Sequence, residues 1–146
     1  MATMLSTLLV AWCLLALTVM IHATGLAVLL RRTLRAPGRP DTRFWPVTWL
    51  LVHVAAWLIF LHLTEIGVWA LFYWWQKCMP DAESSFYFSG VTYATVGYGD
   101  LVLPKEWRLL GPVEGLTGIL MCGLSTGFFF AVVNKVFGAR SSAESS

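Results

Sequence analysis

Three long stretches of the chain are apolar and free of charged side chains. Residues 4–30 and 44–64 contain no Asp, Glu, Lys or Arg, and residues 115–134 are equally uncharged. Each stretch is close to the roughly 20 residues that a helix needs to cross the hydrocarbon core of a bilayer. The pattern predicts an all-α integral membrane protein with three transmembrane helices, within residues 1–30, 44–75 and 107–137.

The composition agrees with a membrane protein rather than a soluble domain. Hydrophobic residues make up 58% of the chain and charged residues 12%, and the mean hydropathy is +0.69. A net charge of +2 gives no support for a nucleic-acid partner, so we expect the lipid bilayer instead. The first stretch is about twice as long as the core of a signal peptide, and no Lys or Arg precedes it, so we expect it to be retained as a helix.

Basic residues are concentrated in the connection between the first two predicted helices, at residues 31–43. Five of the ten Lys and Arg residues lie there, at Arg31, Arg32, Arg35, Arg39 and Arg43. The positive-inside rule places this loop and the tail at 138–146 in the cytoplasm and the N-terminus outside. We expect the protein to lie in the cell (inner) membrane. Pro37, Gly38 and Pro40 interrupt the loop, so its arginines do not form a voltage-sensing helix. The serine-rich tail is expected to be disordered.

A short helix is predicted between the second and third spans. Asp81 suits an N-cap, and Glu83 in the first turn suits the positive end of the helix dipole, which predicts a helix over 82–94. A helix of about 20 Å is too short to cross the membrane. We therefore expect it to enter the bilayer and return, with its negative C-terminal end directed at the interior, where it would favour a cation.

The residues after this helix read Thr-Val-Gly-Tyr-Gly-Asp, at 95–100. Gly97 and Gly99 alternate with larger residues, and glycine enters the positive-φ region without steric cost. Such alternation can direct successive carbonyl oxygens to one side, unlike a strand, so that they replace the water around a dehydrated cation. One copy cannot surround an ion, which predicts a closed assembly of four identical subunits.

Residues 92–100, Thr-Tyr-Ala-Thr-Val-Gly-Tyr-Gly-Asp, resemble the signature of the potassium channel superfamily. Over about residues 44–137 the order of outer helix, pore helix, filter and inner helix also resembles small bacterial two-helix pore subunits, here with an extra N-terminal span. The resemblance implies a tetrameric channel that conducts K⁺ passively, without a cofactor. The alternatives are a weakly selective cation channel and an accessory pore subunit.

The resemblance also implies roles for single residues. The ion sites would be formed by Thr95, Val96, Gly97, Tyr98 and Gly99. The Tyr98 ring would face away from the axis and pack on Tyr87 and Phe88, where many relatives carry two Trp residues that supply indole donors. Asp100 would lie at the outer mouth. Val91 occupies the position of a buried Glu in some relatives, so Asp100 is expected to lack that carboxylate partner.

Glycines recur along the third predicted span, at Gly111, Gly115, Gly118, Gly123 and Gly127. Two of the spacings are GxxxG, which typically allows close helix packing in lipid. The alternative function is a gating hinge near mid-helix, with Gly118 favoured and Gly123 second.

A few ionisable residues fall within or near the predicted spans. Glu65 is expected near the outer surface of its helix, and Glu114 is expected to hydrogen-bond behind the pore helix. His62 and Glu65 share a helical face and are possible metal ligands, whereas His53 projects from the opposite face. None of the three histidines, and neither glutamate, belongs to a hydrolase or metalloprotease motif. No enzyme activity is therefore expected.

The three cysteines do not form a pattern typical of a disulfide framework. Cys13 and Cys122 fall in predicted spans as small apolar residues. Cys78 lies in the outer loop, where it either remains reduced or pairs with its copy in another subunit.

Overall fold

Four helices make up the computed structural model, which describes the backbone of residues 4–35 and 44–144 and the side chains of 4–32 and 44–136. They are α1 (Met4–Arg35), α2 (Phe44–Trp75), α3 (Ala82–Tyr93) and α4 (Leu110–Glu144), with no strand in these residues. Helices α1, α2 and α4 are long and apolar enough to cross a membrane. The predicted all-helical class with three spans is confirmed, and the protein is a multi-pass membrane protein.

The ends of the helices follow local backbone interactions. Helix α2 ends because Lys77 adopts a left-handed conformation (φ 54°) and the Cys78 N–H donates to the Tyr73 carbonyl. Helix α4 begins at Leu110 rather than at the predicted 107, since two hydrogen-bonded turns, from Pro104 to Trp107 and from Trp107 to Leu110, occupy the preceding residues.

Two further predicted boundaries, both at helix ends, are wrong. Helix α1 continues to Arg35, and α4 continues to Glu144 through most of the predicted tail, because no proline interrupts either segment. Arg39, Arg43 and the prolines of the basic loop lie outside the described residues, as do residues 145–146.

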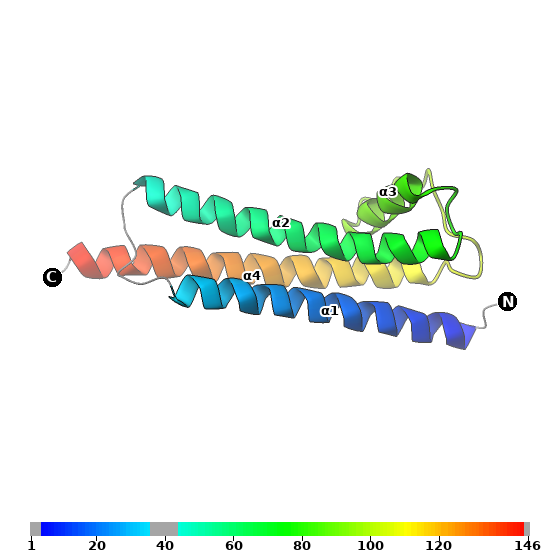
Figure 1. Cartoon of the computed structure of the whole chain (residues 1–146), viewed down its shortest axis with the longest axis horizontal. Helices are drawn as coiled ribbons and strands as arrows, with labels where there is room; N and C mark the ends of the chain where they lie inside the picture. The colour runs from blue at the N-terminus through cyan, green and yellow to red at the C-terminus, as the bar shows by residue number, and fades with distance from the viewer. Residues whose placement is uncertain (1–3, 36–43, 145–146) are drawn as a thin grey trace.

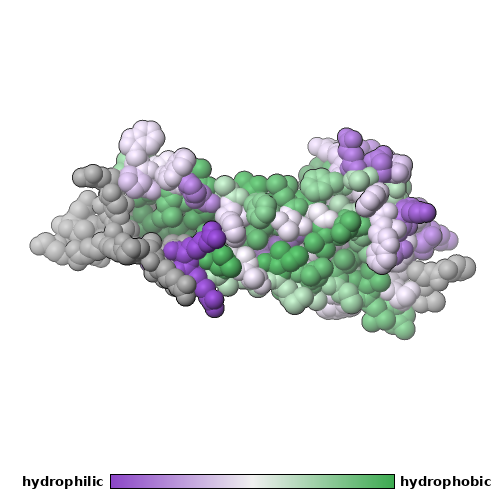
Figure 2. Space-filling model, viewed as in Figure 1, coloured by the Kyte–Doolittle hydropathy of each residue, from purple (hydrophilic) through white to green (hydrophobic). Residues whose placement is uncertain are grey.

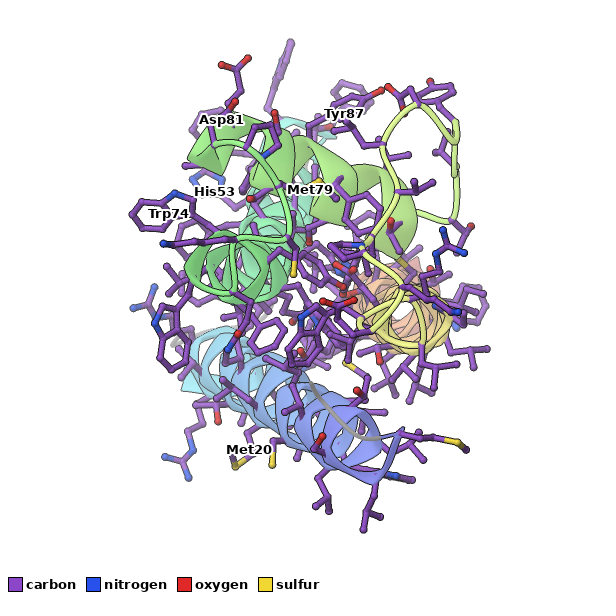
Figure 3. The ribbon with its side chains drawn as sticks, turned by 90° about the vertical axis from the view of Figure 1, so that its right-hand side faces the viewer. Met20, His53, Trp74, Met79, Asp81 and Tyr87 are labelled. Atoms are coloured by element: carbon purple, nitrogen blue, oxygen red, sulfur yellow. The ribbon has the colours of Figure 1, made fainter. Side chains whose placement is uncertain are left out.

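The helices form three layers. Helices α2 and α4 lie between α1 on one side and α3 on the other (Figure 3). The start of α1 lies at the same end of the molecule as α3, and the end of α4 lies at the opposite end, as do the end of α1 and the start of α2 (Figure 1). Which of the two ends faces the cytoplasm stays a prediction.

Apolar side chains cover the middle of the long helices, while hydrophilic ones gather toward the two ends (Figure 2). Exposed tryptophans mark both ends of α2, with Trp45 and Trp49 near its start and Trp74 and Trp75 at its end. Tryptophan is enriched where a membrane protein meets the two lipid–water interfaces. The surface therefore has the banded pattern of a membrane protein.

Helix α1 is joined to the rest of the chain along its length by hydrogen bonds. The Thr7 hydroxyl donates to the Glu106 carbonyl at 3.2 Å, and the Trp69 indole donates to the Thr18 hydroxyl at 3.1 Å. The Trp57 indole donates to the Gly25 carbonyl at 3.2 Å, where a Cβ on Gly25 would lie 2.3 Å from the Leu61 side chain. A side chain at position 25 would therefore force Leu61 to move at this close approach of α1 and α2.

Candidate functional site

Asp81 fixes the start of α3, as the sequence predicts. Its side chain accepts a hydrogen bond from the Ser84 N–H at 2.7 Å, and its backbone is extended, as is usual for an N-cap. These hydrogen bonds from Ser84 lower the pKa of Asp81. The residue therefore stays charged at neutral pH and complements the positive end of the helix.

The backbone of the 95–100 segment alternates in the sign of φ. Gly97 and Gly99 have φ values of 57° and 77°, as their sequence pattern predicts. Thr95 also has a positive φ, of 60°, which costs a β-branched residue about 1–3 kcal/mol and was not predicted. The Thr95 N–H donates to the Thr92 carbonyl at 2.9 Å, which helps to hold this conformation.

The Val91 carbonyl connects α3 to the segment. It accepts hydrogen bonds from the Val96 N–H at 2.9 Å and from the Gly97 N–H at 3.3 Å. From the sequence, Val91 was expected to matter only as the replacement of a carboxylate. In the structure it is the backbone carbonyl of Val91, not its side chain, that binds the 95–100 segment.

Tyr87 restrains Asp100, at the far end of the segment. The Tyr87 hydroxyl donates to one Asp100 carboxylate oxygen at 2.8 Å, and the Leu101 N–H donates to the other at 3.1 Å. The hydrogen bond to the carboxylate raises the pKa of Tyr87. Many relatives have a Trp at this position, whose indole N–H would donate a hydrogen bond. In this chain the Tyr87 hydroxyl is the donor instead.

Phe88 and Tyr98 do not pack together within one chain. Phe88 turns into the core and packs edge-on against Tyr73 of α2, with ring centroids 5.3 Å apart. Tyr98 is 71% exposed. The implied packing of Tyr98 on Phe88 is therefore not formed in a single subunit.

Glu114 is fully buried and hydrogen-bonds behind α3, which confirms that prediction. The Tyr73 hydroxyl donates to its carboxyl group at 2.7 Å, and the Ser89 hydroxyl of α3 contacts the other carboxyl oxygen. The Ser89 oxygen also lies 2.9 Å from the Ile66 carbonyl. Because Ser89 has one hydrogen and meets two acceptors, a protonated Glu114 satisfies both contacts.

Glu65 lies inside the protein, so its predicted place near the outer surface is wrong. It is fully buried, because α2 continues for about 15 Å beyond it, to Trp75. One carboxylate oxygen lies 2.7 Å from His22 Nδ1, and the other accepts from the Tyr93 hydroxyl. His22 was missed as a partner, although a histidine in an uncharged apolar stretch was a usable signal.

Four helices contribute to the buried polar group around Glu65. His62 Nδ1 lies 3.0 Å from the Tyr93 hydroxyl, and the Ser125 hydroxyl of α4 lies 3.0 Å from His62 Nε2 and 3.2 Å from His22 Nε2. The resulting hydrogen-bonded ring is termed the Glu65 cluster and consists of His22, His62, Glu65, Tyr93 and Ser125. Helices α1 and α3 do not pack on each other, so this cluster joins them through α2.

The glycines of α4 fall into two groups. A Cβ on Gly118 would lie 2.0 Å from the Tyr93 carbonyl, and one on Gly115 would lie 3.4 Å from the Thr92 carbonyl. A Cβ on Gly111, Gly123 or Gly127 would meet nothing within 4 Å. Gly115 and Gly118 thus allow α4 to approach the end of α3 closely. Helix α4 is continuous through Gly118 and Gly123, and a gating hinge at either residue stays a prediction.

Cys78 packs in the apolar core at the end of the molecule that carries α3. Burial, together with the nearby Glu106 carboxylate, raises the pKa of its thiol to about 11. The thiol is thus protonated at neutral pH, and pairing with another subunit would require it to leave this core. Cys13 and Cys122 are exposed on α1 and α4.

Comparison with protein families places most of the helical core in a known family. A family model described as "Ion channel" matches residues 47–135, which is more than half of the chain. The matched region runs from α2 through α3 and the 95–100 segment into α4, and it leaves α1 outside. No curated protein and no solved structure matches the chain.

Proposed function

We propose that this chain, which belongs to the ion channel family and carries a pore domain of the two-helix potassium-channel type, forms a tetrameric channel selective for K⁺. Membership of this family supports a channel rather than an enzyme. Selectivity for potassium and assembly as a tetramer are the further steps of the proposal. Both rest on the geometry of the 95–100 segment.

The alternating φ of the segment is the observation that carries the proposal. Positive φ values at Thr95, Gly97 and Gly99, with none at the residues between them, suit a backbone whose successive carbonyl oxygens face one side. Carbonyl oxygens in such a row replace the hydration shell of K⁺ in potassium-selective filters. The oxygens of Thr95, Val96, Gly97 and Tyr98 would form the ion sites, with the Thr95 hydroxyl at the inner end.

Exposure of the same segment supports assembly around a shared axis. In the single chain Val96 is 52% exposed and Tyr98 is 71% exposed, although both are large and apolar or aromatic. Four copies around an axis would supply enough oxygens to surround one ion. The Tyr98 ring would then pack on α3 of the neighbouring copy, since Phe88 of its own chain is turned into the core.

The direction of α3 supports a cation as the permeant ion. The helix runs from the Asp81 cap toward the 95–100 segment, so its negative C-terminal end lies beside the proposed pathway. We propose that α3 re-enters the membrane from the outer face. Arg31 and Arg32 then lie at the cytoplasmic end of α1, in agreement with the positive-inside rule.

Ion flux into liposomes that contain the purified protein tests the proposal. We expect K⁺ flux well above Na⁺ flux in the wild type and its loss in Gly97→Ala, because alanine at φ 57° is strained and reorients the carbonyls. Gly67→Ala is the matched control, since a Cβ on this helical glycine meets nothing within 4 Å.

Each other result identifies a rival function. Equal K⁺ and Na⁺ flux would favour a weakly selective cation channel, and no flux from correctly assembled protein would favour an accessory subunit. Native mass spectrometry of the same sample tests assembly, with four copies of the 16.3 kDa chain expected.

A further inference from the structure

The Glu65 cluster brings together three groups that commonly bind metal ions. His22 on α1 and His62 and Glu65 on α2 each offer a ligand atom, and these atoms all lie within 4.8 Å of one another. His22 Nδ1 lies 2.7 Å from one Glu65 oxygen, and His62 Nδ1 lies 3.8 Å from the other. The ligand atoms therefore converge on one small volume between two helices.

Ser125 orients both imidazole rings. Its hydroxyl oxygen lies 3.2 Å from His22 Nε2 and 3.0 Å from His62 Nε2, so it can accept a hydrogen bond from each ring at once. Without an ion, the Tyr93 hydroxyl donates to Glu65, so the contact of His62 Nδ1 with Tyr93 places a hydrogen on that nitrogen. A bound ion would take the Nδ1 lone pairs of both rings, and both ring hydrogens would then lie on Nε2, facing Ser125. Metal-binding histidines usually have a partner of this kind on the second ring nitrogen.

We propose that His22, His62 and Glu65 bind a divalent transition-metal ion of the Zn²⁺ class. Ligands at about 2.0–2.1 Å around a tetrahedral ion are about 3.3 Å apart, which falls between the 2.7 Å and 3.8 Å separations. Small side-chain shifts bring the three groups to the ion. The Tyr93 oxygen, 3.0 Å from His62 Nδ1, or a water completes the coordination.

The ligand set selects the class of ion. Two imidazoles and one carboxylate suit Zn²⁺ and its neighbours, whereas Mg²⁺ and Ca²⁺ prefer sets made of oxygen alone. Glu65 is the sole charged side chain of α2 and supplies a negative charge to the buried ion. His62 is the more accessible of the two histidines, with 18% of its side chain exposed against 0% for His22.

The proposed site would join α1 to the pore domain. His22 lies outside the region that matches the ion channel family, and the other two ligands lie inside it. Tyr93, which contacts both Glu65 and His62, is two residues before Thr95. Bound metal therefore holds the extra helix against the part of α3 that supports the 95–100 segment.

Cobalt absorption tests the site directly. Purified protein carrying Cys13→Ala and Cys122→Ala, to remove the exposed thiols, is titrated with Co²⁺. We expect one ion per chain, visible absorption typical of tetrahedral nitrogen and oxygen ligands, and displacement by Zn²⁺. Glu65→Gln, which keeps the shape and the polar groups, should abolish the absorption.

Two further variants separate binding from folding. His53→Ala is the matched control, because His53 is exposed and its Nδ1 contacts only the Trp49 carbonyl of its own helix, so absorption should persist. Ser125→Ala should weaken Zn²⁺ binding about 10–100-fold, the usual effect of losing a partner of metal-bound histidine. Zn²⁺ should also raise the melting temperature of the wild type and His53→Ala, but not that of Glu65→Gln.

Two results would overturn the proposal. One is the absence of cobalt absorption in the wild type, which would leave the cluster as a hydrogen-bonded ring without metal. The other is unchanged absorption in Glu65→Gln. Neither result bears on K⁺ flux, which tests the proposed channel function separately.

Discussion

Two buried carboxylates, Glu114 and Glu65, support α3 at two points, and they differ in the helices that they use. Glu114 contacts Ser89 and Tyr73, all within the region that matches the ion channel family. Glu65 contacts Tyr93 at the end of α3, but it also requires His22 from α1, outside that region. The middle of α3 is thus supported by the pore domain alone, whereas the end next to the 95–100 segment depends on the extra helix.

Removing each carboxylate gives the largest expected contrast. Glu65→Ala breaks a buried ring of hydrogen bonds, and we expect a loss of about 3–5 kcal/mol in the free energy of unfolding. Glu114→Ala should lower the free energy of unfolding by about 1–3 kcal/mol. The loss is smaller because Ser89 still donates to the Ile66 carbonyl, and only the Tyr73 hydroxyl loses its partner. Unfolding in mixed detergent micelles, followed by tryptophan fluorescence, measures both. Equal losses would remove the distinction between the two supports.

Gly118 tests the contact of α4 with the end of α3. We expect Gly118→Ala to destabilise the protein by about 1–3 kcal/mol, since its Cβ would overlap the Tyr93 carbonyl and displace the backbone beside Thr95. The same unfolding assay measures the loss. Gly123→Ala is the control, with open space around its Cβ and an expected change within about 0.5 kcal/mol. A greater loss for Gly123→Ala would contradict this account of α4.

A double-mutant cycle sharpens the role of α1. The single variants His22→Ala and Glu65→Ala and their combination should give a coupling energy of about 0.5–3 kcal/mol, because the two side chains contact each other directly. Combining His22→Ala with Glu114→Ala should be additive within about 0.5 kcal/mol, since these residues share no hydrogen-bond partner. Strong coupling in the second pair would show that α1 supports both points of α3.

The smallest expected effect concerns the exposed contact of Tyr87 with Asp100. Because Asp100 raises the pKa of Tyr87, the neutral phenol is favoured in the folded protein. This contribution to stability is present below the ordinary tyrosine pKa of about 10 and is lost as the pH rises through the raised value. Asp100→Asn should lower the pKa of Tyr87, as measured by phenolate absorbance. An unchanged titration would contradict the hydrogen bond.

Features encoded by neighbouring residues were predictable from the sequence. The bounds of α2, the Asp81 cap and the positive φ of Gly97 and Gly99 each follow from a short run of residues. Glu65 was misplaced because its buried partners, His22 of α1 and Tyr93 of α3, are far from it in the sequence.

Features that need tertiary packing were not predictable. The Glu65 cluster draws on residues as far apart as His22 and Ser125, and no local pattern relates them. The positive φ of Thr95 contradicts the preference of a β-branched residue, so contacts around it must impose that conformation.

The tryptophans at the two ends of α2 relate the protein to the thickness of its membrane. Trp45 and Trp74 are separated by about 43 Å along the helix, at 1.5 Å per residue, close to the about 40–45 Å that a bilayer measures with its headgroups. A thinner bilayer would be matched by tilting α2. Helix α2 carries Glu65 and also Tyr73, which donates a hydrogen bond to Glu114 of α4. Such a tilt would therefore disturb both supports of α3 together and make the pore sensitive to lipid chain length.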